Sequence, residues 1–157
     1  MPNLTETLAR WMPALALTLA GCGVGPVAER GPGGVLLPCP PAPHCVSSID
    51  PLTDHHVDPL VFRGSGADAR AQLIRALKSL PRTQIVDEQP GYLRAEARST
   101  LMRFVDDLQC EIKPAPAGGS GIIDVRSSSR VGYYDFGANR ERVESLRKAF
   151  AAAAEQP

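Results

Sequence analysis

The sequence predicts an α+β domain: a four-stranded antiparallel meander with an N-terminal and a C-terminal helix packed on one face. Three observations predict it. A helical apolar repeat follows Ser65, strand-like alternation fills much of residues 83–131, and a second helical repeat begins near Asn139. A sheet with one apolar face needs a covering layer, and the two helices supply it. We therefore expect a two-layer domain.

The first helix is expected over residues 66–79, because Ser65 and Asp68 form an S-x-x-D capping pattern and Pro81 ends the helix. The strands are expected where polar and apolar residues alternate between Gly- or Pro-rich turns. They cover about 83–87, 92–98, 102–112 and 122–131. In the final helix, which Asn139 or a near neighbour can cap, Val143, Leu146 and Phe150 share one face.

Length and charge exclude several classes of protein. The chain has 157 residues, with 17 Lys plus Arg against 17 Asp plus Glu, so its formal net charge is zero. A protein that binds nucleic acid independently of sequence normally carries a basic excess, so no nucleic-acid partner is expected. No apolar stretch approaches the roughly 20 residues of a membrane-spanning helix. The sequence indicates no cofactor and does not reveal the oligomeric state.

The N-terminus is typical of an exported protein. Residues 1–21 read as a signal peptide, because an apolar run from Trp11 to Ala20 follows Arg10. Leu19-Ala-Gly-Cys22 resembles the bacterial lipobox, which implies a lipid on Cys22 that attaches the protein to the membrane. By resemblance to Gram-negative lipoproteins, an Asp directly after the lipidated Cys is the usual signal for retention in the inner membrane. Residue 23 is Gly here, so we expect an anchor in the outer membrane that faces the periplasm. Residues 22–38 are expected to form a flexible Gly/Pro tether, and residues 39–154 one globular domain.

Three further cysteines follow the lipobox. Cys39 and Cys45 are close in sequence and are the natural disulfide pair in an oxidising compartment. Closing so short a loop stabilises a protein by roughly 2 kcal/mol on the chain-entropy model. A metal site that adds His44 is the alternative, but it lacks a fourth ligand and a CxxC-type spacing. Cys110, on an apolar strand face, is expected to be a buried thiol.

The face of the meander opposite the helices is expected to be charged. Its residues by alternation are Arg94, Glu96, Arg98, Arg103, Asp107, Glu111, Asp124, Arg126, Ser128 and Arg130. One interpretation is a solvated ladder of cross-strand ion pairs. The other is a surface that binds an anion, since Arg binds carboxylate or phosphate bidentately. The candidate ligand-binding residues are Arg98, Arg126, Arg130, Arg140 and Tyr133.

Asp106 differs from this pattern because alternation turns it toward the apolar face. A buried carboxylate needs a partner, so we expect a buried ion pair. The candidate partners are Arg98, Arg130 and Arg140. The aromatic residues Tyr133, Tyr134 and Phe136 either plug the edge of the core or line a ligand-binding mouth.

Several segments together resemble the domain-of-unknown-function 1499 family, found in bacterial envelope proteins and in plastids. They are PCPPAPHCVSS (38–48), HHVDPLVF (55–62), LPRTQIVDEQPGYLRAEARS (80–99), RFVDDLQCEI (103–112) and DVRSSSRVGYYDFGANRERVESLR (124–147). The resemblance spans residue 38 to about 150 and implies a location in the cell envelope. It implies no biochemical activity. The position before Cys45, commonly Asn in the family, is His44 here.

Two functional hypotheses follow. The first is a non-catalytic binding or structural module whose Arg-rich face or Tyr loop binds an anionic envelope component or a protein partner. The alternative is a small hydrolase or transferase with His55 or His56 as general base, Asp106 or Asp135 to orient it, and a serine nucleophile. The candidate nucleophiles are Ser47, Ser48 and Ser99. Adjacent histidines cannot readily face one ion, so no metal site is expected at His44, His55 and His56.

Overall fold

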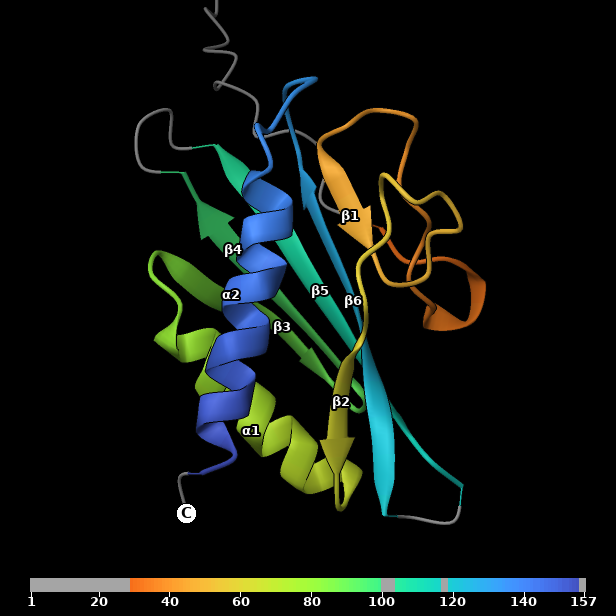
Figure 1. Cartoon of the computed structure of the whole chain (residues 1–157), viewed down its shortest axis with the longest axis vertical. Coiled ribbons are helices and arrows are strands. Elements are labelled where there is room, and N and C mark those ends of the chain that lie inside the picture. The colour runs from red at the N-terminus through yellow and green to blue at the C-terminus, as the bar shows by residue number, and fades with distance from the viewer. Residues whose placement is uncertain (1–28, 100–103, 117–118, 156–157) are drawn as a thin grey trace, which may run out of the picture.

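Figure 1 shows the computed structural model, which describes residues 29–99, 104–116 and 119–155. The predicted signal peptide, Cys22 and Gly23 lie outside the described residues. Two helices pack on one antiparallel sheet, which confirms the α+β class. Within the part of the chain that the structure describes, no helix is both long enough and apolar enough to cross a membrane.

The central meander lies where alternation predicted it. Its strands are β3 (Thr83–Gln89), β4 (Tyr92–Arg98), β5 (Val105–Pro114) and β6 (Ser120–Ser129). Each pairs antiparallel with the next, and Asp106 lies opposite Ala97 on one side and Ser129 on the other. These pairings place successive side chains of β5 on opposite faces of the sheet.

The sheet has six strands, so the prediction of four strands with an N-terminal helix was wrong. β1 (Cys45–Ser47) and β2 (Leu60–Arg63) precede the first helix and pair with successive parts of β6, as Figure 1 shows. β1 has three residues, all buried, and therefore no alternation. β2 has four residues. Both pair with a strand far along the chain, which a local pattern does not reveal.

The helices cover one face of the sheet. α1 (Gly66–Ser79) has the predicted bounds, and the Ser65 side chain accepts a hydrogen bond from the Asp68 N–H at 3.1 Å. α2 (Ala138–Ala153) packs beside α1. The core lies between helices and sheet. Its fully buried members include Leu73, Leu77, Leu93, Leu108, Ile123, Val125, Val143 and Leu146.

Residues 29–38, predicted to belong to a free tether, pack against the domain instead. A short 3-10 turn (Pro32–Gly34) lies in this segment. The Arg30 guanidinium lies 3.9 Å from the centre of the Tyr92 ring, and Leu36 is only 2% exposed. The Gly and Pro content predicted a tether. The cation–π contact of Arg30 and the buried side chain of Leu36 instead stabilise the packing of this segment against the domain.

Candidate functional site

The charged face of the sheet is organised around Asp107, which is 1% exposed. Arg130 donates to both of its carboxylate oxygens at 2.7 Å, and Arg94 donates to Oδ1 at 2.9 Å. Arg130 also donates to Glu96 at 2.6 Å. The hydrogen bonds to Asp107 raise the pKa of Arg130 above its usual value. Arg130 is therefore engaged within the protein.

Two other arginines predicted on this face, Arg98 and Arg126, have polar partners of their own. Arg126 is 8% exposed, donates to Gln109 at 3.2 Å, and has a pKa that burial lowers. The half-exposed Arg98 guanidinium lies 3.6 Å from Glu96. Arg98 lines a cavity on the helix side of the sheet, and the lining of that cavity includes neither Arg126 nor Arg130. The ion-pair ladder accounts for most of this face.

Arg140 holds the loop that carries the two histidines. Its Nη1 and Nη2 donate to the carbonyls of His56 and Asp54, each at 2.8 Å. The Nδ1 atoms of His55 and His56 lie 2.9 and 3.0 Å from the carbonyls of Cys45 and Asp50. Across residues 29–99, 104–116 and 119–155, no serine hydroxyl hydrogen-bonds to either histidine ring. The hydrolase alternative therefore lacks its central contact in this geometry.

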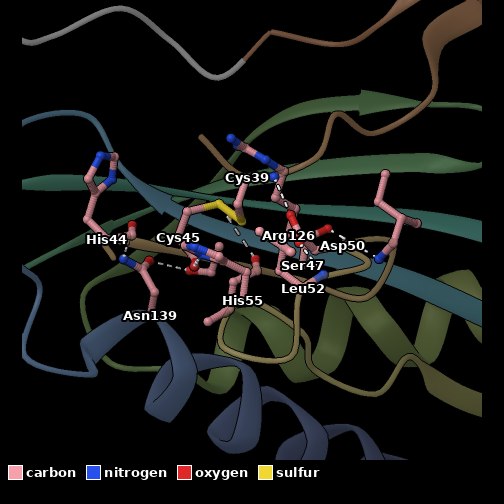
Figure 2. The surroundings of a disulfide bond; sticks show 12 residues. Cys39, His44, Cys45, Ser47, Asp50, Leu52, His55, Arg126 and Asn139 are labelled. Carbon is pink, nitrogen blue, oxygen red and sulfur yellow. Dashed lines mark hydrogen bonds between the residues drawn. A yellow bond between two sulfur atoms is a disulfide. The ribbon is translucent and has the colours of Figure 1, made fainter. Parts of the chain in front are cut away.

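The disulfide between Cys39 and Cys45 confirms the predicted pair, and Figure 2 shows its surroundings. It occupies both thiols that the metal alternative required. The Asp50 carboxylate accepts the backbone N–H of Cys39 at 2.8 Å and that of Leu52 at 3.0 Å. Burial alone raises the pKa of Asp50, but these N–H groups outweigh it and bring the pKa below its usual 3.8.

Cys110 is a free, fully buried thiol whose pKa burial raises to about 12.

Asp106 turns toward the helix side and is 3% exposed. Its partner is Arg142, whose Nη2 lies 2.5 Å from Oδ2, and not Arg98, Arg130 or Arg140. Arg142 Nη1 also donates to Asn139 Oδ1 at 2.7 Å. The spacing of three residues from Asn139 to Arg142 places both on one helix face, and this is the signal that could have identified Arg142.

Asn139 is fully buried in the first turn of α2, where its side chain connects several segments, and the N-cap of α2 is Gly137. The amide of Asn139 donates to the His44 carbonyl at 2.9 Å and accepts from Ser127 at 2.6 Å. Asp135 accepts the backbone N–H groups of Gly137 and Asn139. Burial alone raises the pKa of Asp135, but these bonds bring it below the usual value. These bonds join α2, β6 and the disulfide loop, and Figure 2 shows Asn139 beside His44 of that loop.

The three aromatic residues do not plug the core, because Tyr133, Tyr134 and Phe136 are 63%, 67% and 94% exposed. They line a groove of about 480 Å³ together with Pro41, Pro43, Cys45, His55 and Arg140. We call this the aromatic groove. Phe136 has a φ of +54°, in the left-handed region that non-glycine residues rarely adopt. The tyrosine rings pack edge to face with centroids 5.0 Å apart.

Residues 35–150 match the family described as "Protein of unknown function (DUF1499)", and the chain belongs to this family. A comparison with curated proteins finds no match.

Proposed function

We propose that this family member is a lipid-anchored protein of the bacterial envelope that binds a protein partner through the aromatic groove. The lipobox resemblance of Leu19 to Cys22 supports the anchor. The observation that carries the binding role is Phe136, whose side chain is 94% exposed on a backbone of positive φ. Such a conformation costs on the order of 1 kcal/mol. The exposed ring gains little packing in return, since its ring contact is with Tyr134, at 6.4 Å between centroids.

The chemistry of the groove favours a protein over an inorganic anion. Arg140 already donates to two backbone carbonyls, and Asp135 accepts the N–H groups at the start of α2. The groove also presents the rings of Tyr133, Tyr134 and Phe136 and two prolines, Pro41 and Pro43, to a partner. Tyr, Phe and Arg are enriched at the centres of protein interfaces, where rigid rings bury area at a small entropic cost.

Site-specific photo-crosslinking in the native cells tests the groove. A photoreactive residue at Tyr134 is expected to give one discrete protein adduct. The same residue at Val61, which is 69% exposed on β2, is the matched control and is expected to give none. Phe136→Gly removes the ring while suiting the positive φ, so the Tyr134 adduct is expected to fall at unchanged thermal stability. An adduct of equal yield at Val61, or one insensitive to Phe136→Gly, contradicts the groove.

The anchor is tested separately. Cys22→Ser is expected to abolish incorporation of labelled fatty acid and to release the protein from the membrane fraction. Ser substitutions at Cys39 and Cys45 are the matched control and are expected to leave labelling unchanged. Labelling that survives Cys22→Ser excludes this anchor without bearing on the groove.

A further inference from the structure

The edge of the sheet beside the aromatic groove is already occupied. The Ser47 N–H of β1 donates to the His55 carbonyl at 2.8 Å, and the Ser47 carbonyl accepts from the Val57 N–H at 3.3 Å. The Cys45 carbonyl lies 2.9 Å from His55 Nδ1. A peptide that adds a strand to a sheet needs free N–H and carbonyl groups along the edge. A ligand of the groove therefore does not bind as an added β-strand of β1.

The exposed rings of the groove come from one short stretch of chain, residues 133–136. The ring centroids of Tyr133 and Tyr134 are 5.0 Å apart, and those of Tyr134 and Phe136 are 6.4 Å apart. An amphipathic helix is bound through anchors that recur over several of its turns, which requires a longer trough. A polyproline II helix rises roughly 3.1 Å per residue, so neighbouring rings can each contact a different residue of one such ligand.

The tyrosine hydroxyls of the groove suit the backbone of a proline-rich ligand. The hydroxyl of the buried Tyr92 accepts a hydrogen bond from Gln109, whereas within the described ranges those of Tyr133 and Tyr134 have no such partner. Proline has no N–H, and the carbonyls of a polyproline II helix form no hydrogen bonds within it. The ligand backbone therefore offers acceptors, and each tyrosine hydroxyl can donate to one of them.

The charges that line the groove are unbalanced. The carboxylates of Asp54 and Asp135 stand against one guanidinium, that of Arg140, so the lining is negative while the imidazole of His55 is neutral. Asp135 accepts N–H groups of α2, whereas Asp54 is exposed and, among the described residues, bonds through its backbone carbonyl. A cation on the partner gains from this excess, and an anion is disfavoured.

The groove is proposed above to bind a protein partner, and on that basis we propose that the bound segment is proline-rich, adopts the polyproline II conformation and carries Lys or Arg beside its prolines. Aromatic-lined grooves recognise such segments because the ligand is already extended and loses little conformational entropy on binding. The prolines pack against Tyr134 and Phe136, and Asp54 attracts the cation.

Peptide titrations of the full chain in detergent micelles, followed by NMR on the amide signals of residues 133–137, test the ligand class. The probe has the sequence Pro-Pro-Lys-Pro-Pro-Lys-Pro-Pro with blocked ends. One control peptide replaces every Pro by Ala, and the other replaces both Lys by Glu. Saturable binding of the probe is expected with a Kd below about 1 mM. The Ala peptide is expected to bind at least about tenfold more weakly, because it has to be ordered. The Glu peptide is also expected to bind more weakly than the probe, by a margin that shrinks as salt is added.

Two pairs of variants test the side chains. Phe136→Gly removes a ring while suiting the positive φ, and is expected to weaken probe binding about tenfold or more. Phe104→Ala removes a ring that is 42% exposed outside the groove, and is the control with unchanged binding expected. Asp54→Asn is expected to weaken binding of the Lys peptide but not of the Glu peptide. Asp58→Asn, at an 89% exposed side chain outside the groove lining, is its control and is expected to change binding less.

The proline-rich class is overturned if the probe does not bind saturably, if the Ala peptide binds as tightly, or if a folded Phe136→Gly variant binds the probe as the native chain does. Equal affinity for the Lys and Glu peptides overturns the requirement for a cation. A discrete adduct at Tyr134 in cells without peptide binding rejects the proline-rich class and retains the groove as a protein site. Peptide binding without any adduct supports the ligand class and counts against a partner in the native cells, so the two failures are distinguishable.

Discussion

Asp106 and Asp107 are consecutive residues on β5, yet the sheet sends them to opposite faces with different surroundings. Arg94 and Arg130 both donate to Asp107, and both of its oxygens accept hydrogen bonds. Among the described residues, Asp106 pairs with Arg142 alone, on a helix that packs over the sheet, and its other oxygen has no donor there. The charged face is therefore a redundant network within the sheet, whereas Asp106 depends on one arginine from the helix layer. The two aspartates should therefore differ in how much stability is lost when one arginine is removed.

The largest loss of stability is expected from breaking the buried ion pair between Asp106 and Arg142. Arg142→Ala leaves Asp106 buried without its ion-pair partner and also removes a donor to Asn139, so the free energy of unfolding is expected to fall by about 3–5 kcal/mol. Urea denaturation measures the change. Arg70→Ala breaks the exposed pair with Glu88 and is the control, with an expected loss below about 1 kcal/mol. Equal losses for the two variants exclude a special role for Arg142.

The disulfide loop is hydrogen-bonded to α2, because the His44 carbonyl accepts a hydrogen bond from the Asn139 side chain. Replacing Cys39 and Cys45 together by Ser is expected to lower the free energy of unfolding by roughly 2 kcal/mol, because the loop gains freedom in the unfolded chain. Thermal denaturation of the native and doubly substituted chains measures the loss. An unchanged melting temperature contradicts a stabilising role for the loop.

A smaller loss of stability is expected from a substitution on the charged face of the sheet. Arg94→Ala removes one hydrogen bond from Asp107 but leaves both bonds from Arg130, so the loss is about 1 kcal/mol. The same urea titration measures it beside Arg142→Ala. A loss as large as that of Arg142→Ala shows that the two faces do not differ in the way their hydrogen bonds suggest.

The contrast also separates what sequence could predict from what it could not. Alternation along β5 correctly turned Asp106 and Asp107 to opposite faces, and capping residues gave α1 its exact bounds. Helical spacing places Arg142 on the face of α2 that carries Asn139, but which side chain of that face reaches Asp106 depends on the rotation of α2 about its axis, which tertiary packing decides. β1 and β2 were missed for a related reason, because each is short and acquires its hydrogen bonds only from β6. Phe136 was recognised as one of three aromatics, but its exposure and positive φ required coordinates.

The smallest expected effect concerns the carboxylates that accept backbone N–H groups: Asp50 at the disulfide loop and Asp135 at the start of α2. Their pKa values are lowered in the folded protein. Each therefore contributes stability that is fully present above the unfolded pKa of about 3.9 and is lost as pH falls through the lower folded value.

Stability of the native chain is accordingly expected to decline as the pH falls below about 4, and Asp50→Asn is expected to flatten that decline while lowering stability at pH 7. Urea titrations at pH 7 and pH 3 measure both effects. Asp54→Asn, at an exposed residue of the neighbouring loop, is the control and should preserve the native pH dependence. If Asp50→Asn leaves the acid dependence intact, the bonds to Cys39 and Leu52 do not contribute to it. The decline then has to be assigned to the helix side, where Asp135→Asn repeats the measurement.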